Sequence, residues 1–250
     1  MADSTTPTPR ATSNRSTTPV SSTFAQYIAS QWAPVPTFAA SPREQAPFAA
    51  ARRARISDLY RGKRLIVPAG AAKARSNDTD YPYRAHSAFA WLTGWGSDSV
   101  AGSVLVLEPT AEGHDATLYF REAAGRDTDE FYANPEIGEF WTGPRPSLDH
   151  VAADLGLSTS GLGALAAVLD ATDAATLVVR DADRDLTDQL DGRRLLLADD
   201  IDSLNTDEDA DLARDLSELR LVKDEFEIAE MRAAVDATKQ GFDDVIGDLA

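Results

Sequence analysis

Histidine, aspartate and glutamate are the side chains of this sequence that could bind a metal or transfer a proton. The three histidines, His86, His114 and His150, lie far apart, and none belongs to a His-Glu-x-x-His motif. The aspartate-rich stretch 181–185 lacks the central glycine and closing glutamate of a calcium-binding loop. Since the chain has no cysteine, thiolate metal sites, disulfides and cysteine nucleophiles are excluded. We therefore predict no metal ligand and no catalytic residue in this chain.

Side chains that could bind a ligand are concentrated in residues 75–94. This stretch combines a polar turn, aromatic rings and an arginine. Pro82 fixes its own backbone and favours an extended conformation of the preceding residue, so the Tyr-Pro-Tyr stretch should be stiff. Ser87 can cap a short apolar helix, and Gly94 is placed for a left-handed C-cap. On residue types alone, the simplest interpretation is a well-packed edge of the core.

The order of these residues resembles the N-terminal domain of aminopeptidase P, an Xaa-Pro aminopeptidase of the creatinase and prolidase superfamily. The matching residues are Ser76, Asp78, Tyr81, Pro82, Tyr83, Arg84, Ser87, Phe89, Leu92, Thr93 and Gly94. Residues 139–145, Glu-Phe-Trp-Thr-Gly-Pro-Arg, resemble the family's Glu-x-Trp-x-Gly-x-Arg loop. Residues 218–232 resemble the junction into the family's catalytic domain. The resemblance covers about residues 42–250.

This resemblance implies a metallo-exopeptidase that removes the N-terminal residue preceding a proline. In the family, two metal ions, typically manganese, hold the attacking hydroxide. Their ligands belong to a C-terminal domain of pita-bread shape and would all lie beyond residue 250. We therefore expect this chain to be inactive alone and to bind no metal. It should contribute the shape of the substrate pocket and oligomer assembly, as a dimer or tetramer.

The resemblance also implies two substrate-binding residues, Trp141 and Asp78. In the family, the N-terminal domain lends residues to the active site of a neighbouring subunit. The Trp141 indole suits stacking on a proline ring, and the Asp78 carboxylate suits a peptide's terminal amine. Each has a structural alternative: Trp141 could fill the domain core, and Asp78 could cap a turn. Tyr81, Tyr83 and Arg84 are assigned to the scaffold.

Composition narrows the possible partners. The formal net charge is −17 and the pI is about 4.5, so nucleic acid and anionic membranes are disfavoured. No run of about 20 apolar residues is present, so we expect a cytoplasmic protein. The family resemblance implies that its partners are peptides with proline at the second position. The Ser-, Thr- and Pro-rich residues 1–22 are predicted to form a disordered arm.

Alternating strand and helix patterns predict an α/β domain over residues 23–217, with a mixed sheet flanked by helices. Expected strands lie at 65–68, 99–107, 117–120 and 177–179, and expected helices at 147–155 and 162–171. Another helix should begin at Ser41 with Pro42 in its first turn and place its arginines away from the core. The aspartate-crowded stretch 181–215 gives the weakest pattern.

Residues 218–250 are predicted to form a linker and the first helix of a truncated pita-bread domain. Asp224 and Glu227 have the spacing of a capping box. The apolar residues of one helix face are Ile228, Met231, Val235, Phe242, Val245, Ile246 and Leu249. Nothing follows Ala250 to cover this face, which could instead dock on the preceding domain or pair with a second copy. Because the family that the chain resembles places its metal-binding domain directly after this helix, we interpret the chain as the front part of a longer protein.

Two alternatives remain open at this stage. One is a stand-alone binding or oligomerisation module without catalysis. The other stays within the superfamily, as the N-terminal domain of a prolidase-like dipeptidase or, less well matched, of a creatinase.

Overall fold

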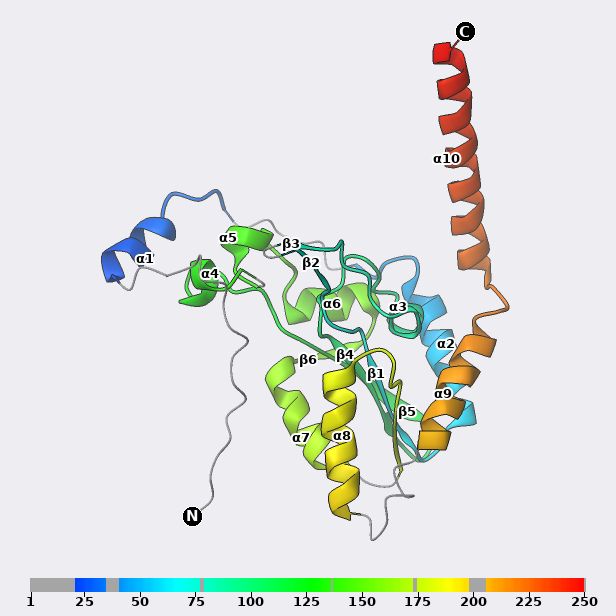
Figure 1. The fold of residues 1–250 in the computed structure, drawn as a ribbon. Helices are drawn as coiled ribbons and strands as arrows, with labels where there is room; N and C mark the ends of the chain where they lie inside the picture. The colour runs from blue at the N-terminus through cyan, green and yellow to red at the C-terminus, as the bar shows by residue number, and fades with distance from the viewer. Residues whose placement is uncertain are drawn as a thin grey trace, which may run out of the picture.

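The computed structural model describes residues 21–34, 41–76, 79–135, 137–172, 175–197 and 206–249. Its centre is a five-stranded sheet in the order β6-β5-β4-β1-β7 (Figure 1). The strands are β1 (Arg64–Pro68), β4 (Val104–Pro109), β5 (His114–Phe120), β6 (Ser158–Gly161) and β7 (Thr176–Val178). The neighbours β1, β4 and β5 are antiparallel, whereas the edge strands β6 and β7 run parallel to the strands they join. The predicted α/β fold with a mixed sheet is thereby confirmed.

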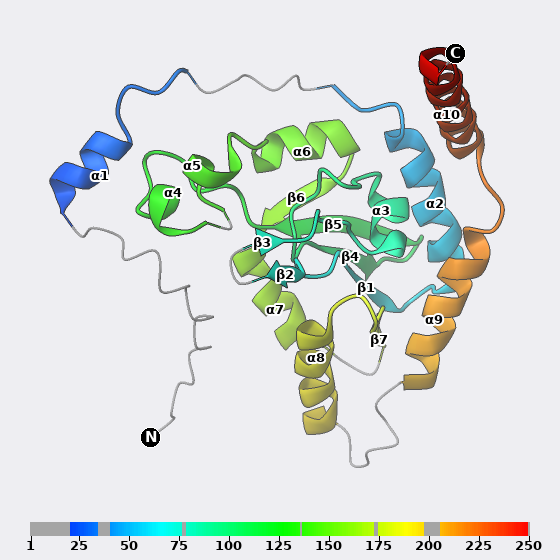
Figure 2. The same cartoon turned by 45° about the horizontal axis from the view of Figure 1, so that its top comes forward.

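Helices cover both faces of the sheet (Figure 2). One face carries α2 (Ala46–Leu59), α3 (Ser87–Thr93), α6 (Leu148–Leu155) and α9 (Thr206–Leu219). The other carries α7 (Leu165–Asp170) and α8 (Arg184–Leu197). The alternation along β1 shows the division: Leu65 and Val67 join the first core cluster, and Ile66 joins the second. The sheet is buried on both sides, which explains the uninterrupted apolar run in β1.

The strands predicted at 65–68, 117–120 and 177–179 form, and so do the helices predicted at 147–155 and 162–171. The last of these begins as a 3₁₀ turn (Leu162–Ala164) that continues into α7. Gly94 has φ of 73° at the end of α3, as expected, and Ser147 caps α6. The predicted strand at 99–107 begins later, at Val104. Residues before it form a turn in which Ser103 Oγ donates to Val100 O at 2.6 Å.

The start of α2 and the position of its arginines were predicted wrongly. The helix begins at Ala46, because Arg43 is held in the preceding turn by Asp154 and by Gly94 O, to which its Nη1 donates at 2.8 Å. Arg52 and Arg53 lie on the buried face, where they donate to the backbone carbonyls of residues 91 and 92. These carbonyls belong to the last turn of α3 and have no hydrogen-bond donor within that helix, so the arginines supply the missing donors.

The N-cap of α3 also differs from the prediction. His86 is the capping residue, and its Nδ1 accepts from Ala88 N at 3.3 Å. Ser87, which was expected to cap, is the first helical residue. An imidazole nitrogen therefore takes the role that was assigned to a hydroxyl.

The predicted C-terminal helix is α10 (Glu225–Leu249), which projects away from the domain (Figure 1). Its capping box forms as predicted: Glu227 N donates to Asp224 Oδ1 at 2.9 Å, and Asp224 N donates to Glu227 Oε2 at 3.1 Å. The apolar face is exposed, with Phe242 at 67% and Leu249 at 83%. Within the described part of the chain, nothing covers this face.

Short elements complete the fold. They are α1 (Ser22–Ile28), the pair β2 (Ala74–Ser76) and β3 (Thr79–Asp80), α4 (Glu130–Ala133) and α5 (Glu139–Thr142). Three of them, α1, α4 and α5, lie on the far side of the domain from α10 (Figure 1). The predicted arm, residues 1–22, lies outside the described residues except for Ser21 and Ser22, which begin α1. None of the helices in the described ranges is long and apolar enough to cross a bilayer.

Candidate functional site

Trp141 stands on α5 within a cluster of aromatic side chains. The members of this aromatic cluster are Phe24, Trp32, Phe131, Tyr132, Phe140 and Trp141. The Trp141 ring lies 5.5 Å from the Tyr132 ring and 5.0 Å from the Phe140 ring, and its Nε1 donates to Tyr132 O at 2.8 Å. Its side chain is nevertheless 50% exposed. Trp141 therefore does not fill the domain core, and it presents one part of a fixed indole to the surface.

The turn that carries Trp141 depends on Gly138. Gly138 N donates to Asn134 O at 2.8 Å, and Trp141 N donates to Gly138 O at 2.9 Å. A Cβ atom at Gly138 would lie 2.6 Å from Asn134 O and 2.7 Å from Glu130 O, and closer still to Phe131 O. Glycine is required here because α4 and α5 approach through backbone, with no room for a side chain.

We predict that Gly138→Ala separates α4 from α5 and frees the indole of Trp141. The overpacking should cost about 1–3 kcal/mol of unfolding free energy. Thermal denaturation gives this loss, and limited proteolysis within residues 121–145 reports the local opening. Gly163→Ala is the matched control, because its Cβ would meet nothing within 4 Å. Equal effects of the two substitutions would contradict the prediction.

The N-terminal segment 21–34 covers one side of the aromatic cluster. Phe24 on α1 packs edge-to-face on Tyr132 at 5.5 Å, and Trp32 packs in the same way on Phe131 at 5.9 Å. Arg126 Nη2 donates to Ala33 O at 2.6 Å. These contacts leave the Trp141 indole uncovered and support the loop that bears it. No sequence pattern predicted them, since α1 is only two turns long.

The tyrosine segment, residues 81–94, joins the first helix layer to the sheet. Tyr83 Oη donates to Gly70 O at 2.9 Å, and His86 N donates to Ala69 O at 2.8 Å. Burial raises the pKa of Tyr83 to about 12, so its phenol keeps its proton well into the alkaline range. Tyr83 has the scaffold role that was predicted for it. Arg84, in contrast, is exposed, and no hydrogen bond or ion pair of its side chain occurs in the described ranges.

Comparison with known proteins decides the family. The family model for the aminopeptidase P N-terminal domain matches residues 49–179, which is more than half of the chain. The chain belongs to the aminopeptidase P N-terminal domain family. Xaa-Pro aminopeptidase 2 of Streptomyces coelicolor is 41% identical over 223 residues, which cover 88% of this chain and 44% of that protein. Xaa-Pro aminopeptidase 1 of the same organism is 39% identical over 227 residues, covering 91% and 43% respectively. The chain thus spans less than half the length of these relatives.

Solved structures of similar chains include aminopeptidase P from Escherichia coli. It has a TM-score of 0.47 and 19% identity, and the match covers 61% of this chain and 34% of that one. Aminopeptidase PepP from Pseudomonas aeruginosa has a TM-score of 0.47 and 23% identity, with coverage of 62% and 33%.

Of the two predicted site residues of this aminopeptidase P N-terminal domain, only Trp141 is placed by the structure. Asp78 lies outside the described residues, between β2 and β3. In the described ranges, no group of three or more histidine, aspartate or glutamate side chains is arranged to hold a metal ion. The residues described here therefore do not fit the two-metal centre that the family resemblance implies.

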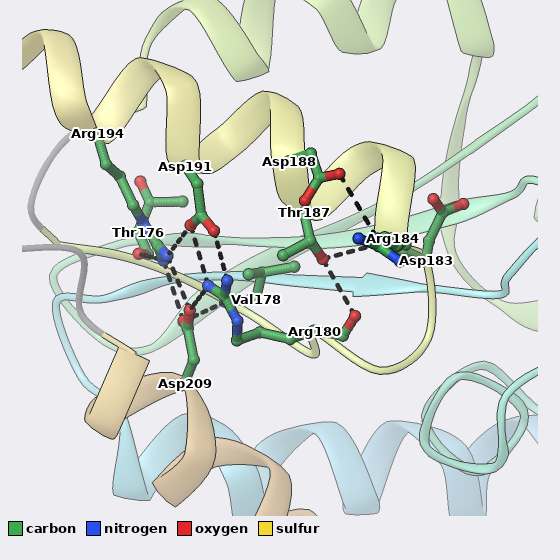
Figure 3. A network of polar contacts seen from close by, with 10 residues as sticks. All are labelled: Thr176, Val178, Arg180, Asp183, Arg184, Thr187, Asp188, Asp191, Arg194 and Asp209. Carbon is green, nitrogen blue, oxygen red and sulfur yellow. Dashed lines mark hydrogen bonds and ion pairs between the residues drawn. The ribbon is translucent and has the colours of Figure 1, made fainter.

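A buried ionic network was missed by the sequence analysis of this domain (Figure 3). The Asp209 carboxylate on α9 accepts from Val178 N at 2.8 Å, from Arg180 Nη1 at 3.0 Å and from Arg194 Nη1 at 2.8 Å. Asp191 on α8 pairs with Arg180, whose hydrogen bond holds the pKa of that carboxyl below its ordinary value. The network ties α8 and α9 to β7, so we assign it to the scaffold.

A signal for this network was present in the sequence. Leu186, Leu190 and Arg194 recur at four-residue spacing on one face of α8. Asp209 shares a face of α9 with Leu212 and Leu216. A charge on the apolar face of each of two neighbouring helices predicts a buried pair, because a single buried charge is too costly.

Proposed function

We propose that this chain is the N-terminal part of a metal-dependent Xaa-Pro aminopeptidase, which removes the N-terminal residue preceding a proline from peptides. One observation carries the proposal: 88% of the chain aligns at 41% identity with a protein named Xaa-Pro aminopeptidase 2. The catalytic metal ligands, manganese being the expected metal, would lie in the remainder of the longer protein. By the longer protein we mean this chain continued to the length of its relatives.

In this proposal, the chain shapes the substrate pocket through Trp141. A flat indole that is held by Tyr132 and half exposed can stack on a proline ring without first losing side-chain freedom. Asp78 would orient the peptide's terminal amine through a charge-assisted hydrogen bond, a role that rests on the family resemblance. Tyr83 would hold the tyrosine segment, which lies between Asp78 and Trp141 in the sequence, in position.

Assembly is the second proposed contribution. Trp141 points outward, so its partner would be the active site of a neighbouring subunit in a dimer or tetramer. Residues 218–250 would open the catalytic domain, whose later residues would cover the exposed apolar face of α10. Such burial stabilises by roughly 1.5–3 kcal/mol per large side chain. The cytoplasmic location remains a prediction from the sequence.

The test is hydrolysis of Xaa-Pro peptides by the longer protein and by its Trp141→Ala variant. Losing the stacking surface should lower kcat/KM by about 10- to 100-fold, which corresponds to about 1.4–2.8 kcal/mol. The melting temperature should change little, because Trp141 is half exposed. Tyr27→Ala is the matched control, since Tyr27 is an exposed aromatic residue outside the aromatic cluster.

Two results would count against the proposal. Absence of Xaa-Pro hydrolysis by the longer protein would reject the function itself. A variant with lowered stability and unchanged turnover per folded molecule would reject the role of Trp141 and leave the function standing.

A further inference from the structure

A cavity of about 610 Å³ opens beside the tyrosine segment, far along the chain from Trp141. It lies where the start of α2 and the tyrosine segment, which includes α3, meet the junction between α9 and α10. The polar residues that line it include Gln45, Arg52, Arg84, Ser87, Arg220 and Glu227. Three of these carry guanidinium groups and one carries a carboxylate. In a chain of net charge −17, this excess of positive charge needs an explanation.

Arg52 forms the wall of this arginine cavity. It is 2% exposed, its Nη2 lies 2.7 Å from Asp224 Oδ2, and its Nη1 donates to Trp91 O at 3.1 Å. The guanidinium also lies over the Trp91 ring, 5.5 Å from its centroid. The Glu227 carboxylate is likewise occupied, because it accepts from Asp224 N at 3.1 Å. Each of these groups is used within the protein.

Arg84 and Arg220 differ from Arg52 in having no such partners. In the described part of the chain, neither side chain has a carboxylate within ion-pair distance, and neither donates a hydrogen bond. Both nevertheless extend from well-held backbone. Arg84 follows Tyr83, whose Oη donates to Gly70 O at 2.9 Å, and Arg220 N donates to Ser217 O at 3.2 Å. Two unpaired guanidiniums therefore border one cavity from two different elements.

We propose that the arginine cavity binds a small oxyanion, a phosphate or a carboxylate, between Arg84 and Arg220. Guanidinium groups bind both oxyanions through paired charge-assisted hydrogen bonds. The Gln45 amide and the Ser87 hydroxyl line the same cavity and can add neutral donors. Because the cavity joins the tyrosine segment to the α9–α10 junction, the bound anion fixes the direction in which α10 leaves the domain. The proposal does not rest on the proposed Xaa-Pro hydrolysis.

The experiment is calorimetric titration of the 250-residue chain with inorganic phosphate and, separately, with citrate. Ionic strength is kept at about 0.15 M with chloride, so that unspecific attraction is screened equally throughout. Saturable binding is expected, and Arg84→Gln and Arg220→Gln should each weaken it by about 10-fold or more. Arg84→Lys should weaken it less than Arg84→Gln, since charge is kept and the planar fork is lost.

Arg61→Gln is the matched control, because it removes the same charge from an exposed arginine that already pairs with Asp58. Binding by this variant should equal that of the parent chain. Each variant is also melted without added anion, where an unchanged melting temperature shows that it folds. Absence of saturable binding by the parent chain would overturn the proposal. So would equal weakening by Arg61→Gln and the two cavity variants.

Discussion

The 250-residue chain by itself is expected to release no N-terminal residue from Xaa-Pro peptides, with or without added manganese. Activation of water by a two-metal centre needs several carboxylate and imidazole ligands around one point. In the ranges that the structure describes, no three such side chains come together. The longer protein should hydrolyse the same peptides. We therefore expect no measurable rate of hydrolysis from the 250-residue chain and normal turnover from the longer protein.

The hydrogen bonds of two histidines give a physical reason to expect that the 250-residue chain is inactive. His114 lies between Ser57 and the Lys63 backbone, with Nδ1 2.7 Å from Ser57 Oγ and Nε2 2.6 Å from Lys63 O. The Nδ1 atom of His150 lies 2.8 Å from Ser147 Oγ. Recruiting either ring as a ligand would break these hydrogen bonds and leave partly buried polar groups unpaired.

The measurement is peptide hydrolysis by the 250-residue chain and by the longer protein, both purified in the same way. The peptides carry proline or alanine at the second position. The alanine peptide controls for host aminopeptidases. Manganese-dependent turnover of the proline peptide by the short chain, in proportion to its concentration, would contradict the proposed location of the ligands. An inactive longer protein would instead favour the stand-alone binding module.

The sheet was predictable because its strands are short apolar runs between turn residues. The run of β1 (Arg64–Pro68) is buried on both faces, and its pattern allows few other structures. The edge strand β6 (Ser158–Gly161) has the sequence Ser-Thr-Ser-Gly and carries no apolar signal. It forms because its backbone pairs in parallel with β5, a tertiary contact that local sequence does not encode.

The helix boundaries that differed from prediction share one cause, which is contact between distant parts of the chain. Ser41 and Pro42 have the residue types of a helix start, but Arg43 is bound to Asp154, 111 residues away. Arg52 and Arg53 look solvent-exposed by residue type, yet they bind carbonyls of α3. Local propensity cannot weigh such partners, so tertiary structure overrides it.

The candidate site was predictable only in part and for a different reason. Trp141 was chosen through the family resemblance, whereas its exposure and its anchoring by Tyr132 required the structure. The contacts of Phe24 and Trp32 with the aromatic cluster join segments about a hundred residues apart, and no periodicity marks them. Arg84 was assigned to the scaffold together with Tyr81 and Tyr83, and its exposed side chain, which has no hydrogen bond or ion pair in the described ranges, is the basis of the proposed oxyanion site.

Removing the Asp209 carboxylate should cost more stability than any other single substitution considered. The side chain is fully buried and balances Arg194, whose own side chain is 2% exposed. In Asp209→Ala, the buried Arg194 guanidinium loses this partner, and among the described residues Asp191 is a second carboxylate, at 3.2 Å from it. Breaking such a pair on one side typically costs about 3–5 kcal/mol. For a chain of this size, each kcal/mol lowers the melting temperature by about 2–4 °C, so we expect a fall of about 6–20 °C.

Denaturant unfolding of the parent chain and two variants tests this expectation. Asp211→Ala is the matched control on the same helix, because Asp211 is 52% exposed and pairs only with the exposed Arg214 in the described part of the chain. Its cost should stay below about 1 kcal/mol. Replacing Arg194 together with Asp209 by leucines should recover part of the loss, since apolar groups then fill the site without a buried charge. Comparable losses in Asp209→Ala and Asp211→Ala would show that α9 tolerates loss of its buried anchor, and the network would then have no structural role.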